Sequence, residues 1–150
     1  MAMHTWFECK IRYEKVMENG MQKKVTEPYL VDALSFTEAE ARIIEEMTPF
    51  ISGEFTVSDI KRANYSELFP SDEESADRWF KCKLIFITLD EKSGAEKKTS
   101  TQVLVQAADL RDAVKKLDEG MKGTMADYQI GMVSETPLMD VYPYSAGPKD

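Results

Sequence analysis

The sequence predicts an α+β fold that arises by internal duplication of a strand–strand–helix–strand unit. The first observation is a repeated hexapeptide, since Trp6–Ile11 (WFECKI) returns as Trp79–Leu84 (WFKCKL) 73 positions later. The second is that both halves alternate apolar and polar residues before a stripe of helical period. The third is that the similarity continues in order along nearly the whole of both halves, with the offset changing by one residue at turns. Ordered similarity of this extent favours duplication over chance.

The opening strand of each unit is predicted by alternation, which places one set of side chains on each face of a sheet. The apolar face consists of Phe7, Cys9, Ile11 and Tyr13 in the first unit and of Phe80, Cys82, Leu84 and Phe86 in the second. Asn19-Gly20 and Ser93-Gly94 predict the hairpin turns that follow. The second strands end at Tyr29–Ala33 and Val103–Ala107.

A helix is expected after the second strand of each unit. Ser35 and Glu38 have the spacing of a capping box, and Asp109 with Asp112 is its acidic counterpart. Apolar residues at helical spacing then form one stripe per unit, consisting of Phe36, Ala39, Ile43 and Met47, and of Leu110, Ala113, Val114, Leu117 and Met121. Pro49 and Gly123 predict the helix ends.

A third strand is predicted at Phe55–Ile60 and at Tyr128–Val133. We expect these strands to bend and continue through Tyr65–Phe69 and Leu138–Tyr142. The predicted organisation is then a first repeat at 1–70, an acidic linker at 71–77, a second repeat at 78–144 and a flexible tail at 145–150.

The packing of the two units follows from their size. One helix over one sheet gives a unit of about 70 residues only a thin core. We therefore expect one compact domain with a pseudo-two-fold axis, with both helices on one side of antiparallel sheet. The sequence leaves open whether the strands form one continuous sheet or two facing sheets.

Composition and charge favour an acidic cytoplasmic protein. The 150-residue chain has a net charge of −8 and a pI near 4.8. This charge argues against duplex DNA as the main partner, because phosphate binding needs a basic surface. The N-terminal residues lack the basic and apolar regions of a secretory signal. No apolar run approaches the roughly 20 residues that span a bilayer, so no membrane association is expected.

The residues that carry most catalytic and metal chemistry are scarce. One histidine, His4, and two cysteines, Cys9 and Cys82, leave almost nothing from which to build a zinc site or a nucleophilic triad. Both cysteines fall on the apolar face, where a free thiol behaves as a small hydrophobic group. No Walker loop, dinucleotide glycine pattern or nucleophile elbow is present. We therefore expect no metal, no cofactor and no catalytic residues.

The polar face of the predicted sheet carries the candidate binding residues. Aromatic and cationic side chains gather there, namely Trp6, Lys10, Arg12 and Lys24 in the first unit and Trp79, Lys81, Lys83 and Lys98 in the second. An open face of this kind suits single-stranded nucleic acid, because bases stack on rings and phosphates pair with cations. The alternative is that the lysines solvate the face, while the tryptophans pack against a partner or a terminal segment. Leu30, Ile85 and Leu104 share the face and favour this alternative, with a second subunit as one possible cover.

Three segments of the chain resemble an uncharacterised protein family of about this length. These segments are WFECKIRYEK, NGMQKKVTEPYLVDALSFTEAEARIIEEM and GEFTVSDIKRANYSELF. The family is a domain of unknown function, which we associate with Bacteroidetes and the phages that infect them. The resemblance covers nearly the whole chain. It implies a cytoplasmic bacterial or phage setting, and it brings no activity, cofactor or catalytic residue.

These observations favour a non-enzymatic binding or adaptor protein. It would use its pseudo-two-fold surface, or the groove between the repeats, for a small ligand or a protein partner, and a homodimer is compatible with it. One alternative is single-stranded nucleic-acid binding through the Trp/Lys face. A weaker alternative is an enzyme whose active site lies in the groove and is built from acidic side chains.

Overall fold

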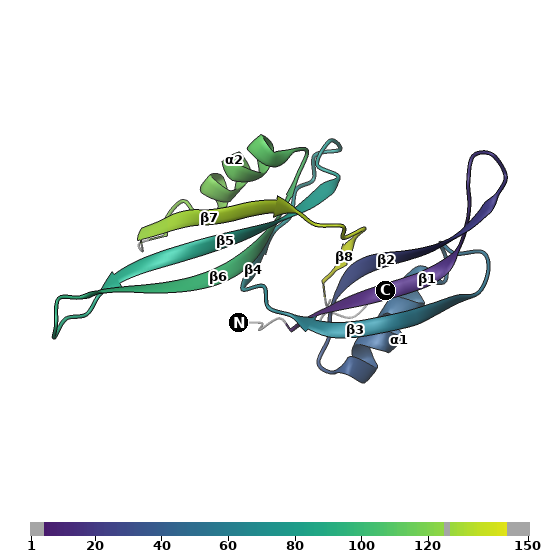
Figure 1. Ribbon diagram of the computed structural model, residues 1–150, viewed down its shortest axis with the longest axis horizontal. Coiled ribbons are helices and arrows are strands. Elements are labelled where there is room, and N and C mark those ends of the chain that lie inside the picture. The colour runs from purple at the N-terminus through teal and green to yellow at the C-terminus, as the bar shows by residue number, and fades with distance from the viewer. Residues whose placement is uncertain (1–4, 125–126, 144–150) are drawn as a thin grey trace, which may run out of the picture. The chain divides into compact units, whose positions relative to one another are not determined.

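The computed structural model describes residues 5–124 and 127–143 and confirms an α+β fold with two helices and eight strands (Figure 1). The described strands form two separate four-stranded sheets rather than one continuous sheet. The chain divides into two compact units, each with one sheet and one helix. The predicted helices and the three main strands of each unit are all present. The predicted tail at 145–150 lies outside the described residues.

The first unit contains the described residues 5–64 and 137–143. Its sheet has the strand order β3-β1-β2-β8 and is covered on one face by the helix α1. The element bounds are β1 (Trp6–Val16), β2 (Gln22–Asp32), α1 (Phe36–Met47), β3 (Phe55–Ala63) and β8 (Val141–Tyr142). β1 pairs antiparallel with both β2 and β3, whereas β8 pairs parallel with β2.

The second unit is continuous in sequence and spans Tyr65–Thr136. Its sheet has the order β4-β6-β5-β7 and is covered on one face by α2. The element bounds are β4 (Glu67–Phe69), β5 (Arg78–Leu89), β6 (Glu96–Ala107), α2 (Leu110–Gly120) and β7 (Asp127–Glu135). β5 pairs antiparallel with β6 and β7, whereas β4 pairs parallel with β6.

The short strands β4 and β8 correct two of the predictions. They are not continuations of the third strands: β4 follows β3 in sequence but pairs in the second sheet, and β8 follows β7 but pairs in the first. β8 pairs with the edge of β2, and β4 pairs with the edge of β6. The backbone groups of a sheet edge are otherwise unpaired and can accept another strand. Because this pairing is parallel, both sheets are mixed rather than antiparallel. The segments 65–70 and 137–143 therefore pack with the opposite unit from the one to which the sequence repeat assigns them.

The two units share further details of geometry. Both contain a register shift in the opening strand, between Lys10 and Ile11 in β1 and between Lys83 and Leu84 in β5. These positions are 73 residues apart, which is the offset of the repeated hexapeptide. The internal duplication and the pseudo-two-fold arrangement stay predictions, and the shared strand order is compatible with them.

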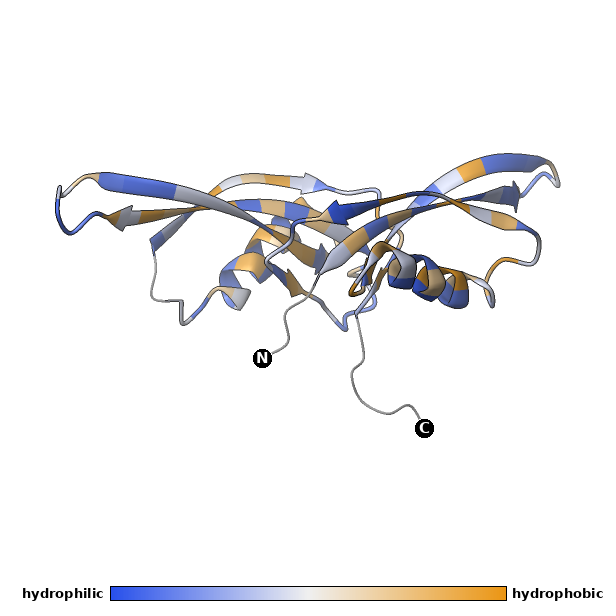
Figure 2. Cartoon of the chain, turned by 90° about the horizontal axis from the view of Figure 1, so that it is seen from below, coloured by the Kyte–Doolittle hydropathy of each residue, from blue (hydrophilic) through white to orange (hydrophobic). Residues whose placement is uncertain are grey.

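Each unit has its own hydrophobic core between the helix and one face of its sheet, and Figure 2 shows hydrophobic segments interleaved with hydrophilic ones along both helices. The buried members of the first core are Phe7, Cys9, Ile11, Val31, Ala33, Ala39, Ile43 and Met47. Those of the second are Phe80, Cys82, Leu84, Val103, Val105, Ala107, Ala113, Leu117 and Met121. The predicted apolar faces of the opening strands are thus confirmed as the core faces.

Both helices begin with the predicted caps. The Ser35 Oγ atom accepts a hydrogen bond from the Glu38 backbone N–H at 3.1 Å. The Asp109 carboxylate does the same for the Asp112 N–H at 2.8 Å. The side chains of Glu38 and Asp112 each accept in turn from the N–H of the residue before the cap. A cap of this kind contributes about 1 kcal/mol to helix stability, which fixes the first turn at equivalent places in both units.

Candidate functional site

The two tryptophans proposed for base stacking are buried. Trp6 and Trp79 point to the sheet face opposite the helix, as predicted, but their exposed fractions in the single chain are only 4% and 5%. Leu30 and Leu104 on the same faces are fully buried. The expectation of exposed indole rings on an open face is therefore wrong, and neither ring offers a stacking surface. Both rings are covered within the single chain, whereas the alternative expected a partner or a terminal segment as the cover.

The predicted cations of the first unit alternate with acidic residues rather than forming a basic strip. Lys10 lies beside Asp59 of β3, and Lys24 lies opposite Glu14. Arg12 is exposed between Thr26 and Thr56. Mixed charges of this kind solvate a sheet face and weaken its attraction for phosphates.

The predicted cations of the second unit surround a different kind of surface. Lys81 lies beside the buried Leu104, Lys83 lies beside Met132, and Lys98 lies beside Ile87. Paired residues project from the same face of a sheet, so these lysines border apolar side chains. The structure brings together the four predicted residues of each unit on that unit's own sheet.

The open face of the second sheet, meaning the face opposite α2, carries an apolar strip that we define as Ile85, Ile87, Leu89 and Met132. Leu89 is 69% exposed and Met132 is 42% exposed, while the two isoleucines are half-buried. Alternation along β5 places Ile85, Ile87 and Leu89 in one row, and Met132 comes from the adjacent strand β7. The strip is therefore continuous along the outer half of the central strand.

Charged residues replace most of the apolar strip in the first unit, although Val16 is an exposed apolar residue at the position of Leu89. At the repeat offset, Ile85 corresponds to Arg12 and Ile87 corresponds to Glu14, so two charged side chains stand where the second unit has two isoleucines. Gly131 sits under the strip, and a Cβ atom there would lie only 2.9 Å from the Ile85 Cδ1 atom. The open faces of the two sheets are thus chemically different although their strand orders correspond.

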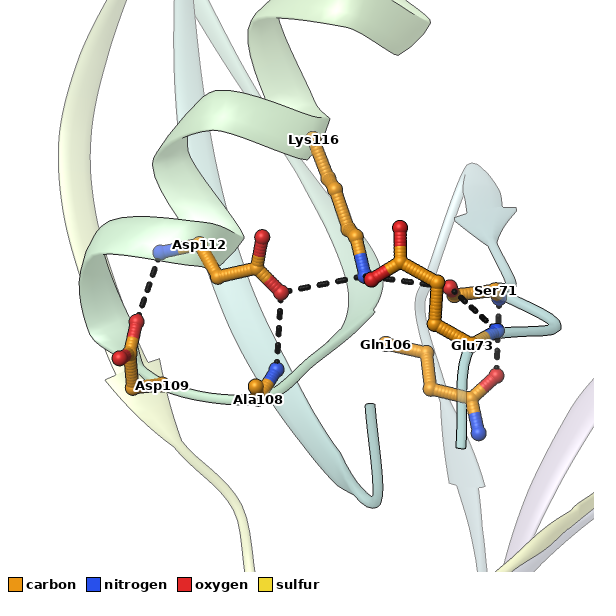
Figure 3. Close-up of polar contacts among 7 residues, drawn as sticks. All are labelled: Ser71, Glu73, Gln106, Ala108, Asp109, Asp112 and Lys116. Atoms are coloured by element: carbon orange, nitrogen blue, oxygen red, sulfur yellow. Dashed lines mark hydrogen bonds and ion pairs between the residues drawn. The ribbon is translucent and has the colours of Figure 1, made fainter. Parts of the chain in front are cut away.

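The best-defined polar cluster of the second unit surrounds Lys116 of α2 (Figure 3). Its ammonium group donates to the Ser71 Oγ atom at 3.1 Å and forms ion pairs with Glu73 at 3.2 Å and Asp112 at 3.1 Å. Gln106 of β6 accepts a hydrogen bond from the Ser71 N–H at 2.9 Å. The segment predicted to be a solvated linker is therefore held against α2 and β6.

A pocket of about 410 Å³ lies beside this cluster and is lined by Phe69, Pro70, Ser71, Asp72, Glu73, Lys116, Glu119 and Gly120. Five of these eight residues are charged or hydroxyl-bearing and only Phe69 and Pro70 have apolar side chains, whereas small-molecule sites are mostly apolar. Lys116 itself is occupied by its three oxygen partners. We therefore interpret the cluster as a structural clamp on the chain that follows β4.

The contact between Lys116 and Ser71 also bears on catalysis, because a serine and a lysine can act as nucleophile and base. Such a lysine must lose its proton, which requires a lowered pKa. Burial by itself would lower the pKa of Lys116, but hydrogen bonds to Asp112 and Glu73 outweigh it and raise the pKa above its ordinary value. This lysine is therefore an ammonium group near neutral pH, and the pair does not form a catalytic dyad.

The first unit has an equivalent clamp with a different cation. Arg42 occupies the position of Lys116 at an offset of 74 and donates to the backbone carbonyls of Asp32 and Pro143. Pro143 follows β8 as Ser71 follows β4. In both units a helix cation thus binds the segment that leaves the short parallel strand.

A second polar cluster, in the first unit, surrounds Glu27 on the core side of the sheet. Its carboxylate accepts hydrogen bonds from the hydroxyls of Tyr13 at 2.8 Å and Tyr29 at 3.4 Å, and Lys15 lies 3.7 Å away. Burial, followed by the bond to Glu27, raises the pKa of Tyr13 to about 12. Both phenols are therefore neutral hydrogen-bond donors at physiological pH, and the cluster closes the end of the core.

Both cysteines are core residues, as the sequence predicts. Burial raises the pKa of Cys9 to about 12, with smaller contributions from Glu8 and Asp59, and raises that of Cys82 to about 11. A thiol with such a pKa is not a nucleophile at neutral pH. Within residues 5–124 and 127–143, no three histidine, cysteine or acidic side chains are grouped so that they could hold a metal ion. The helices of the described residues are also too short or too polar to span a membrane.

A comparison with protein families matches residues 5–144 to a domain of unknown function (DUF4494). Comparisons with curated proteins and with solved structures find no match. The comparisons therefore bring no activity, ligand or partner to the site, and the interpretation of the surface depends on its own chemistry.

Proposed function

The chain belongs to the DUF4494 family, and we propose that it is a non-enzymatic binding or adaptor protein that recognises another protein through the apolar strip of its second sheet. The single observation that carries the proposal is the exposure of Leu89 and Met132 beside two isoleucines on an open sheet face. Exposed apolar surface of this kind is typical of protein interaction sites.

The energetics support a binding role for the strip. Covering the exposed parts of Leu89 and Met132 would contribute on the order of 1–2 kcal/mol each. The first unit shows that this fold accepts Arg12 and Glu14 at the positions of Ile85 and Ile87. The isoleucines are therefore not required to build a sheet of this type, which supports a role outside folding.

A protein partner fits the strip better than the other two ligand classes. Small molecules favour concave sites that enclose most of their surface, whereas the strip lies on the face of a sheet. Single-stranded nucleic acid needs exposed aromatic rings, and both tryptophans are buried. We also propose a cytoplasmic setting, which is supported by the two cysteines that are both free.

Site-specific photocrosslinking tests the proposal. A photoreactive phenylalanine analogue is placed at position 87, or at the equivalent position 14 of the first unit, and producing cells are irradiated. We expect protein adducts at position 87 that are absent at position 14 and that disappear when Ile85→Arg is added. Equal adducts at both positions, or none at position 87, would exclude the strip as a binding surface.

A further inference from the structure

We propose that the partner recognised by the apolar strip is a second copy of the chain, packed face to face along β5 in a symmetric dimer. This inference rests on the proposed function, because it names the occupant of the same surface. Three features of the second sheet support the dimer. They are the apolar centre of the strip, the charges on its two sides, and the contrast with the first sheet.

The charges beside Ile87 are opposite in sign. Ile87 lies on the central strand between Asp127 of β7 and Lys98 of β6, so a negative side chain borders the strip on one side and a positive one on the other. All three project from the same face of the sheet because they are paired residues. One row across the strip therefore reads negative, apolar, positive.

This row is complementary to itself under one two-fold rotation. An axis that runs along β5, between two facing sheets, places β7 of one protomer over β6 of its partner. Asp127 then faces Lys98 of the partner subunit, and Lys98 faces the partner's Asp127, while the two Ile87 side chains meet at the axis. A two-fold axis through Ile87 that runs perpendicular to β5 would instead place Asp127 over the partner's Asp127 and Lys98 over the partner's Lys98, which is unfavourable. The pattern is that of an isologous interface.

The same axis makes a prediction of opposite sign for Lys83. Lys83 lies on the central strand next to Ile85, so the axis brings the two Lys83 ammonium groups together at one end of the strip. Both side chains are exposed and extend into solvent, which limits their repulsion to a modest value. Removing this charge should therefore strengthen the dimer, although it removes a long side chain from the interface.

The first sheet does not offer the same surface, which makes it an internal control. Arg12 and Glu14 occupy the positions of Ile85 and Ile87, so the row that corresponds to Ile87 is charged at its centre. Two copies of that row would bury charged groups without apolar contact, which is costly. Self-association is therefore assigned to the second unit alone.

Sedimentation equilibrium of the intact chain tests the inference from about 1 µM to about 500 µM, the range expected for a small interface. We expect a concentration-dependent rise from 17.1 kDa toward twice that mass. Ile87→Glu should weaken the dimer about a hundredfold by placing carboxylates at its centre. Glu14→Ala, at the equivalent position of the first unit, should leave it unchanged. Circular dichroism confirms that each variant is folded.

Charge exchange tests the axis itself. Asp127→Lys and Lys98→Asp should each weaken the dimer roughly tenfold, and the double variant should recover to within about threefold of the wild type, because the pairs re-form with reversed sign. Lys83→Gln should tighten the dimer about threefold. A double variant no better than the single ones would overturn the inference.

The outcomes separate this inference from the proposed function. A wild-type chain that stays a monomer at about 500 µM overturns the dimer. If position 87 then still crosslinks to a different protein, the proposed function stands without it. If the monomer also gives no strip-dependent adduct, both proposals fail. Adducts at position 87 that join two copies of the chain support both.

Discussion

Lys116 of α2 donates a hydrogen bond to the Ser71 Oγ atom at 3.1 Å, and this contact attaches the chain that follows β4 to the helix of the second unit. The lysine is only 14% exposed and also binds Glu73 and Asp112. An arginine, Arg42, does the equivalent task in the first unit. Each helix thus stabilises its sheet by packing against it in the core, and it also holds the segment that follows the short parallel strand at the sheet edge.

The clamp predicts that Lys116→Met lowers thermal stability. The variant keeps most of the aliphatic stem but loses three polar contacts, so we expect a melting temperature lower by about 3 °C. Thermal unfolding followed by circular dichroism measures it. Lys115→Met is the matched control, because Lys115 is exposed on the next position of the same helix. Equal melting temperatures for the two variants would show that the clamp is energetically neutral.

Asp112 predicts a pH dependence of the same clamp. A hydrogen bond from the Ala108 N–H, followed by Lys116, lowers the pKa of Asp112 below its ordinary value. A lowered pKa means that the carboxylate stabilises the fold above the ordinary aspartate pKa of about 4 and loses this effect as the pH falls. Asp112→Asn should therefore melt below the wild type at pH 7, and the gap should shrink toward pH 3. A gap that is constant with pH would contradict this origin.

The buried thiols predict slow modification of the native chain. With Cys9 at a pKa of about 12 and Cys82 at about 11, thiolate is scarce at pH 8 and reagents cannot reach it. Ellman's reagent should react with two thiols per chain in denaturant and with neither in the native protein over the same time. Rapid reaction of one thiol without denaturant would show that its core opens readily.

The pairing of β8 with β2 predicts long-range coupling between distant parts of the sequence. The Leu30 N–H donates to the Asp140 carbonyl at 3.0 Å, and Val141 is buried at the same edge. Val141→Asp should displace β8 and speed hydrogen exchange at Leu30. Met139→Asp is the control, because that side chain is half exposed. Equal protection of the Leu30 amide in both variants would show that burial of Val141 does not hold β8 at this edge.

Much of each unit was predictable because the signals are local. Alternation identified the core faces from Phe7 to Tyr13, and the caps at Ser35 and Asp109 followed from residues only three positions apart. The exchange of β4 and β8 was not predictable, because strands of two or three residues carry no period and their partners are distant in sequence. The predicted continuation of the third strands therefore failed at their ends.

The candidate surface was only partly predictable. Alternation placed Trp6 and Trp79 on the correct face, but it cannot say what covers a face, so exposed and covered rings stayed alternatives until the structure showed both rings buried. The apolar strip left a signal that a comparison of the halves could have found. Arg12 and Glu14 of the first half align with isoleucines in the second half. A solvated sheet face favours charged residues, so isoleucines at these positions indicate that the face of the second sheet is covered by something.

The discontinuity of the first unit has a consequence for biosynthesis. The second unit is encoded by one uninterrupted segment, Tyr65–Thr136, whereas the first sheet gains its edge strand only from Val141–Tyr142. A ribosome makes the chain from its N-terminus at about 5–20 residues per second, so the first sheet waits with an open edge on β2 while the rest is translated. The half of the protein that is synthesised first is thus the half that is completed last.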